Sequence, residues 1–170
     1  MDILVVVDMQ KDFISGALGT KEALAIVPRV AEKIVQAKKA GKTIVFTRDT
    51  HHENYLDTQE GKNLPVPHCI ENTDGWQIDP GLDTAGAMIF DKPSFGSEAL
   101  VRYLKSLPDL QSAEFVGLCT DICVITNVLS AKCALPELPI SVDSSCCAGV
   151  TPQSHENALS AMRMCQINIL

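Results

Sequence analysis

Ile3-Leu4-Val5-Val6-Val7-Asp8 is the stretch of this 170-residue chain that decides the fold. Its five apolar residues lack the polar alternation of a half-exposed antiparallel strand, which indicates a strand buried on both faces. A secretory signal would begin with a basic leader, which this stretch lacks, and Asp8 closes the run. We therefore expect an internal strand of a globular domain and a cytoplasmic protein.

Further apolar runs alternate with helical patterns along the rest of the chain. Similar buried strands are expected at 43–47, 87–90 and 115–118, with two less regular strands at 140–142 and 167–170. Helical periodicity predicts helices at 22–40, 97–107, 120–135 and 152–165. This alternation is typical of a parallel sheet with helices on both faces. The sequence predicts one α/β domain over residues 1–170, with a Rossmann-like three-layer α/β/α arrangement.

The composition limits the possible partners. With a net charge of -7, the chain lacks the excess of Lys and Arg that nucleic acid or an anionic membrane would require. No apolar run approaches the roughly 18 to 20 residues that span a bilayer. The seven cysteines are odd in number, so without a secretory signal we expect one reactive thiol and no disulfides. A small-molecule substrate is the better expectation, and we expect a homo-oligomer.

Reactive side chains follow the predicted strands. In an open parallel sheet, ligands bind outside the carboxyl ends of the strands, so groups at these ends should meet at one edge whatever the strand order. The residues in question are Asp8, Asp49, His51, Asp91, Lys92, Cys119, Thr120, Asp121 and Cys123. The sequence therefore predicts a site at this edge of the sheet.

Asp8, Lys92 and Cys123 form a chemically consistent set, because a thiol needs a base to become a thiolate and a cation to keep it one. Cys123 falls in the first turn of a predicted helix, where Thr120 can cap and the helix dipole lowers a thiol pKa. The free N–H groups of that turn can receive an oxyanion. The spacing leaves an alternative open, in which Asp8 and Lys92 form a structural ion pair and Cys123 is an ordinary buried thiol.

The long segment 49–80 is polar, interrupted by Pro and Gly, and holds three of the four histidines. A connection of this length in a compact domain is usually functional. Two imidazoles and one or two carboxylates are suitable ligands for zinc, iron or manganese, and the candidates are Asp49, His51, Glu60 and His68. A solvated polar loop is the alternative that the residues alone leave open.

Several motifs resemble those of one family and follow its order through nearly the whole chain. Asp8-Met9-Gln10-Lys11-Asp12-Phe13 resembles the D-x-Q-x-D-F opening of the isochorismatase-like hydrolases. Gly117-Leu118-Cys119-Thr120-Asp121-Ile122-Cys123-Val124 resembles their G-x-x-T-D-x-C-V nucleophile segment, and Lys92-Pro93-Ser94-Phe95 resembles the block with the catalytic lysine. Segments 143–149 and 155–159 resemble the D-A-x-A-x and H-x-x-A-L ending.

Within this superfamily, two segments resemble the metal motifs of nicotinamidases. Asp49-Thr50-His51 resembles D-x-H, and Pro65-Val66-Pro67-His68-Cys69 resembles P-x-H-C. The resemblance implies that Asp49, His51 and His68 bind a divalent metal, for which we expect zinc, with iron or manganese as alternatives. Glu60 is the implied fourth protein ligand, with Glu53 or His52 as substitutes.

The resemblance also implies how an amide would be hydrolysed. Asp8 takes the thiol proton and passes it to the departing ammonia, Lys92 stabilises the thiolate, and Cys123 forms a thioester that water hydrolyses. The implied oxyanion hole consists of the backbone N–H groups of Cys119 and Cys123, with a cis peptide before Thr120.

In nicotinamidases the metal binds the pyridine nitrogen, so the implied role of the ion is to orient the ring more than to activate water. Phe13 and Phe95 are candidates to hold a flat ring, with ordinary core packing as the alternative. Because the metal ligands follow the second strand and the triad is set up elsewhere, we expect Cys123 to stay an activated thiol when the metal is lost.

The resemblance thus implies a metal-dependent amidase acting on nicotinamide or a related small aromatic amide. Thr50 and Cys119 depart from the residues common at these positions in nicotinamidases, which leaves the substrate open. The alternatives are an amidase for another small amide or ureido compound and a catalytically silent member with a binding role. The intact set of Asp8, Lys92 and Cys123 argues against a silent member.

Overall fold

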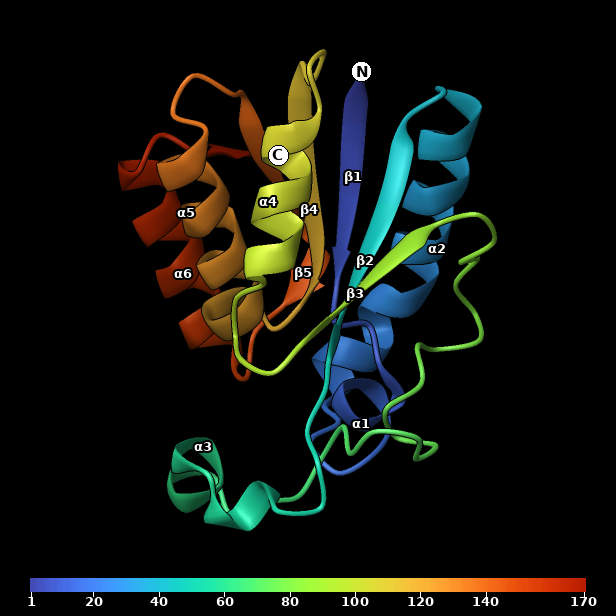
Figure 1. Ribbon diagram of the computed structural model, residues 1–170, viewed down its shortest axis with the longest axis vertical. Coiled ribbons are helices and arrows are strands. Elements are labelled where there is room, and N and C mark those ends of the chain that lie inside the picture. The colour runs from blue at the N-terminus through green and yellow to red at the C-terminus, as the bar shows by residue number, and fades with distance from the viewer.

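The computed structural model describes residues 1–170, and a sheet of six parallel strands runs through its centre (Figure 1). The spatial order is β3-β2-β1-β4-β5-β6. The strands are β1 (Asp2–Val7), β2 (Thr43–Asp49), β3 (Met88–Lys92), β4 (Ser112–Leu118), β5 (Ile140–Ala148) and β6 (Asn168–Ile169). Every pairing between neighbours is parallel, which confirms the predicted class of sheet.

Helices cover the two faces of the sheet, as predicted. The first face carries α1 (Lys11–Ile14) and α2 (Lys21–Lys39), and the other carries α4 (Glu98–Ser106), α5 (Ile125–Ala134) and α6 (Pro152–Met164) (Figure 1). Three short elements complete the chain, namely η1 (Tyr55–Asp57), α3 (Gln59–Asn63) and the π-turn η2 (Thr120–Val124). None of the helices combines the length and apolar content that a membrane crossing requires.

The apolar run that opens the chain is central because β1 contributes to both hydrophobic cores. Ile3, Val5 and Val7 pack into the core under α4, α5 and α6. Leu4 and Val6 point to the opposite face and pack with α2. All five side chains are fully buried, and each such burial stabilises the fold by about 1.5–3 kcal/mol.

Two strands differ from the predictions. β3 was expected to be buried on both faces, but it pairs only with β2 at the edge of the sheet, so Met88 and Ile89 are exposed. β5 is longer than the predicted 140–142. Its register against β4 shifts from Val142 opposite Phe115 to Cys147 opposite Gly117, so the polar residues between them form a bulge inside the strand. That polar bulge hides the second half of β5 in the sequence.

The strand order reverses direction between β1 and β4, and their carboxyl ends therefore form the crevice where ligands bind in open α/β sheets. Gly117 lets the two strands approach, since a Cβ there would lie 2.1 Å from the carbonyl oxygen of Val7. Asp8 follows β1 and Cys119 follows β4 at this point. The connection after β2, which carries α3, extends beyond the same ends of the strands (Figure 1).

Candidate active site and metal site

The structure brings Asp8, Lys92 and Cys123 together at this crevice from three separate elements. The Nζ atom of Lys92 lies 2.7 Å from Oδ2 of Asp8 and 3.5 Å from Sγ of Cys123. Lys92 also donates to the carbonyl oxygen of Ser94 at 2.9 Å. All three members of the set are buried. A base and a cation beside a thiol form one arrangement that can activate a cysteine nucleophile.

The electrostatics of this set differ in one respect from the sequence prediction. Burial would lower the pKa of Lys92, but the neighbouring Asp8 carboxylate raises it, so the side chain stays charged. We predicted a lowered thiol pKa for Cys123. Instead, burial and the negative charge of Asp8 raise that pKa well above its ordinary value, although Lys92 lowers it. This burial depends on the assembled fold and could not be read from the residue pattern.

Burial also raises the pKa of Asp8, against the lowering effect of Lys92. A carboxylate with a raised pKa beside a thiol with a raised pKa is suited to take the thiol proton during attack. The arrangement therefore favours proton transfer from Cys123 to Asp8 in the reaction over a thiolate that persists at rest.

The turn that carries Cys123 also differs from the prediction. It is a π-turn in which Cys119 occupies the N-cap position without a side-chain cap, so Thr120 does not cap it. Instead, the Thr120 hydroxyl pairs with Nδ1 of His155 at 2.8 Å. The cis peptide joins Leu118 and Cys119, one bond earlier than predicted. The N–H of Cys119 donates to no protein group, which leaves it available as the oxyanion donor that we expected.

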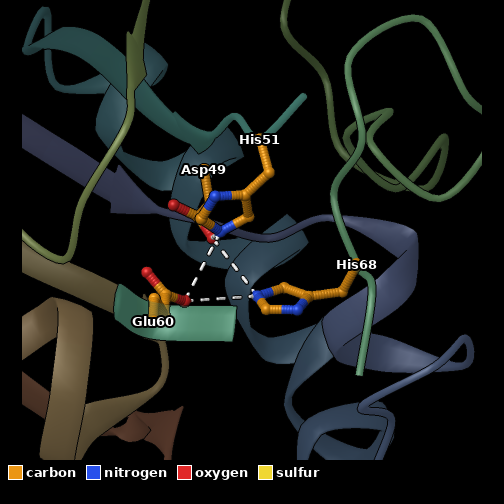
Figure 2. Close-up of side chains that lie close together, drawn as sticks. All are labelled: Asp49, His51, Glu60 and His68. Atoms are coloured by element: carbon orange, nitrogen blue, oxygen red, sulfur yellow. Dashed lines mark ion pairs between the residues drawn. The ribbon is translucent and has the colours of Figure 1, made fainter. Parts of the chain in front are cut away.

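Four further side chains converge on one point (Figure 2). One ligand atom from each of Asp49, His51, Glu60 and His68 lies within 4.8 Å of the others. Nε2 of His51 lies 3.0 Å from Asp49 and 3.4 Å from Glu60, while Nε2 of His68 lies 3.6 Å and 3.7 Å from the same carboxylates. Of the possible fourth ligands, Glu60 joins the cluster, whereas His52 and Glu53 are exposed outside it.

The chemistry of these donors fits a divalent metal. Nδ1 of His68 donates to the carbonyl oxygen of Val66 at 2.8 Å, because a carbonyl can only accept. The tautomer is thereby fixed, and the lone pair of Nε2 faces the cluster. Nε2 of His51 is buried without a hydrogen-bond partner. Although burial lowers the pKa of His51, the carboxylates of Asp49 and Glu60 raise it to about 9, so this site attracts a cation.

Asp49 contacts both the catalytic set, through Lys92, and the metal cluster, through His51. Its Oδ1 accepts from Nζ of Lys92 at 3.1 Å, and its Oδ2 faces His51 at 3.0 Å. We expected the activation of Cys123 to be independent of the metal ligands. Whatever binds Oδ2 changes the charge that Lys92 experiences, so the shared carboxylate is the contact through which the metal ligands would influence Cys123. The independence of the two groups stays a prediction.

A pocket of about 240 Å³ joins the two groups. Cys123 and Cys119 line it together with Asp49, Glu60 and His68, so the candidate nucleophile and three of the four candidate metal ligands face one space. Both predicted ring contacts lie in its wall, Phe13 buried and Phe95 43% exposed. The remaining lining is mostly apolar and consists of Leu18, Thr20, Ala23, Leu64, Leu118, Ile122, Gly149 and Val150.

The sequence analysis missed most of this apolar lining. Leu18 and Thr20 lie in the segment before α2, and Val150 lies before α6. No motif marks these residues, and only their nearness to strand ends could have indicated them. Gln10 and Asp12 stand inside a motif that we quoted, but no role was assigned to them.

Known proteins resemble this chain over its whole length. The family model of the isochorismatase domain matches residues 2–170. The nicotinamidase of Escherichia coli is 29% identical over 195 residues, covering 95% of this chain and 89% of the relative. The nicotinamidase/pyrazinamidase of Mycobacterium tuberculosis is 25% identical over 187 residues, covering 100% and 98%.

Solved structures agree in fold. The pyrazinamidase of Pyrococcus horikoshii in complex with zinc has a TM-score of 0.87 and 30% sequence identity, covering 99% of this chain and 98% of that one. The zinc in that relative and the four-residue cluster found here together suggest a divalent metal.

Proposed function

The chain belongs to the isochorismatase family of hydrolases, and from this membership we propose that it is a metal-containing cysteine amidohydrolase acting on nicotinamide or a related small aromatic amide. One observation carries the proposal, namely that Cys123 and three of the four residues of the metal cluster line the same pocket. A flat substrate with a ring nitrogen at one end and a carboxamide at the other would reach both. The nicotinamidase relatives support the same substrate class.

The proposed reaction uses the triad for all covalent steps. The sulfur of Cys123 attacks the amide carbon while its proton passes to Asp8. The C–N bond then breaks, and ammonia leaves with the proton that Asp8 returns, which gives a thioester. Water attacks the thioester while Asp8 takes a proton from this water. The C–S bond then breaks and Asp8 returns the proton to sulfur, which releases the acid and restores the free thiol. Lys92 stabilises the negative charge that develops on sulfur during the attack and again when the thioester breaks.

The negative oxygen of each tetrahedral intermediate needs hydrogen-bond donors. The free N–H of Cys119 and the N–H of Cys123 are proposed for this role. Removal of one such donor from an enzyme typically lowers kcat by about 10²–10³-fold.

Asp49, His51, Glu60 and His68 would hold the divalent metal, which we propose to be zinc. When bound, the ion would supply a Lewis acid for the ring nitrogen and so fix the orientation of the ring. Phe13 would pack on the ring, and Phe95 would cover it at the mouth of the pocket.

The test is the release of ammonia from nicotinamide by the purified protein, combined with metal analysis. We expect turnover together with about one divalent ion per chain. A panel of aliphatic amides and ureido compounds separates the alternatives. Turnover of one of these compounds, with none of nicotinamide, would replace the proposed substrate class. No turnover of any compound by the metal-loaded protein would favour a binding role.

A further inference from the structure

The side chain of Gln10 is fully buried, and both polar atoms of its amide form hydrogen bonds with the backbone of other segments. Its Oε1 accepts from the N–H of Asp49 at 2.7 Å, and its Nε2 donates to the carbonyl oxygen of Asp49 at 2.8 Å. The same Nε2 donates to the carbonyl oxygen of Trp76 at 2.9 Å. Both peptide groups of one metal-cluster residue are therefore fixed by a single side chain.

Asp12 holds the backbone of the segment that carries His68. Its Oδ2 accepts from the N–H of Cys69 at 2.8 Å. The carbonyl oxygen of Cys69 in turn accepts from the N–H of His51 at 2.9 Å. Cys69 adopts a positive φ of 47°, a conformation that L residues rarely hold without support. Cys69, the residue that follows His68, is thus held by Asp12 through its N–H and by His51 through its carbonyl oxygen.

The position of the Asp12 carboxylate is itself built into the chain. A Cβ placed on Gly75 would lie 2.2–2.3 Å from the carboxylate atoms of Asp12. The N–H of Asp12 donates to the carbonyl oxygen of Gly75 at 3.0 Å. The long connection therefore closes around Asp12 only because residue 75 has no side chain.

We propose that Gln10 and Asp12 are positioning residues that set the geometry of the metal cluster from the turn after β1. Gln10 acts through the backbone of Asp49, and Asp12 acts through Cys69 on both His51 and His68. Three of the four side chains in Figure 2 thus depend on this turn, which also carries Asp8. The proposal rests on the metal site of the proposed function.

The physical reason is that a metal ion tolerates little displacement of its ligand atoms. A divalent ion needs its donor atoms at fixed distances. Residues that hold the ligands in place therefore affect the affinity for the metal. Loss of such outer contacts typically weakens metal binding by about 10–100-fold.

The first test measures zinc affinity alone, by titrating the metal-free protein in competition with a chromophoric chelator. Gln10→Met keeps the size of the side chain and removes its hydrogen bonds, and Asp12→Ala removes the carboxylate. Each is expected to weaken zinc binding by about 10–100-fold. Asp12→Asn keeps one acceptor for Cys69 and should recover most of the affinity.

Ser97→Ala is the matched control. Ser97 is also buried, and its hydroxyl accepts from the N–H of Leu100 at 3.1 Å at the start of α4, away from the metal cluster. Its loss should lower the melting temperature without changing zinc affinity. Equal weakening in this control would assign the effect to general loss of stability and overturn the proposal.

A double-mutant cycle tests Asp12 through its neighbour. Gly75→Ala should displace the carboxylate and weaken zinc binding in the wild-type background, but it should add little to Asp12→Ala, because the clashing atoms are then gone. Additive effects would contradict the proposal, as would wild-type affinity in the folded Gln10 and Asp12 variants. If the wild-type protein binds no zinc, the metal site of the proposed function is itself wrong.

Discussion

Asp49 gives one carboxylate oxygen to each half of the site. Oδ1 pairs with the buried ammonium of Lys92 and Oδ2 faces His51 and His68. Burial would raise the pKa of Asp49, but the neighbouring His51, His68 and Lys92 lower it overall. Its charge also raises the pKa of the Cys123 thiol. A single residue therefore links the metal cluster to the nucleophile.

This link predicts different effects for two substitutions that both remove the metal. Asp49→Asn should lower the thiol pKa, because a negative charge near the sulfur is lost, whereas His68→Ala leaves that charge in place. We expect Cys123 to react faster with iodoacetamide in metal-free Asp49→Asn than in metal-free His68→Ala at the same pH. Peptide mapping after timed alkylation measures the rates. Equal rates would show that Asp49 does not influence the thiol.

Cys123 is the residue on which the proposed chemistry depends. Cys123→Ala should reduce ammonia release by at least about 10³-fold, since the atom that forms the thioester is missing. The fold should survive, because the lost sulfur leaves only a small void. Cys147→Ala is the matched control, as Cys147 is equally buried in the same core but lies outside the pocket. The assignment fails if the Cys123 variant keeps more than a few per cent of the wild-type rate.

At the scale of elements, a group of charges ties α2 to the sheet at the end remote from the site. Glu114 on β4 accepts from Lys33 of α2 at 2.9 Å and pairs with Lys42 at 2.8 Å. Lys33 also pairs with Asp143 of β5 at 2.6 Å. Burial acts to raise the pKa of Glu114, but the hydrogen bonds from Lys42 and Lys33 lower it overall. Lys33 lowers the pKa of Asp143 in the same way, against the effect of burial.

These lowered pKa values determine how stability changes with pH. A carboxylate whose pKa is lower in the fold than in the unfolded chain stabilises the fold above its unfolded pKa, about 4.3 for Glu, and this contribution is lost as the pH falls further. The free energy of unfolding should therefore decrease below about pH 5. Glu114→Gln should lower stability near pH 7 by about 1–3 kcal/mol and flatten this dependence.

Urea denaturation of both proteins between pH 3 and 7 measures the effect. Glu98→Gln is the control, since Glu98 forms an exposed pair with Arg102 one helical turn away, and such pairs contribute little. A Glu114 variant with the wild-type pH dependence would assign the acid sensitivity to other carboxylates.

The sequence predicted the elements best where a single pattern extends over the whole element. The uninterrupted run of β1 identified a strand with two buried faces, and the residues after the strands identified the site. β3 was misjudged because an apolar run does not say how many neighbours a strand has. The bulge of β5 and the pKa of Cys123 depend on register and burial, which only the assembled sheet defines.

At the scale of the whole molecule, the site lies where segments from both halves of the sheet meet. β1 and β4 contribute Asp8 and the turn of Cys123, while β2 and its long connection contribute the metal cluster. The pocket between them is closed by apolar residues before α2 and α6. The homo-oligomer expected from the sequence stays a prediction, which light scattering of the purified protein can test.

The metal cluster and the set of Asp8, Lys92 and Cys123 are proposed to have separate roles in the reaction. If the metal only holds the ring nitrogen, its removal should harm substrates that possess this nitrogen and spare those that lack it. Chelation should therefore lower kcat/KM for nicotinamide by about 10²-fold, which corresponds to about 3 kcal/mol of lost binding in the transition state. Benzamide has the same ring without the nitrogen, so its slower hydrolysis should change by less than about threefold.

The comparison of the two amides is informative because both use the same thiol, base and oxyanion donors. Rates for both are measured before chelation, after chelation and after zinc is restored. An equal loss for nicotinamide and benzamide would mean that the ion supports the shared chemistry, for example through Asp49 and Lys92, which are in direct contact. A loss confined to nicotinamide would locate the role of the metal in orienting the substrate, since the triad would then act on benzamide without the ion.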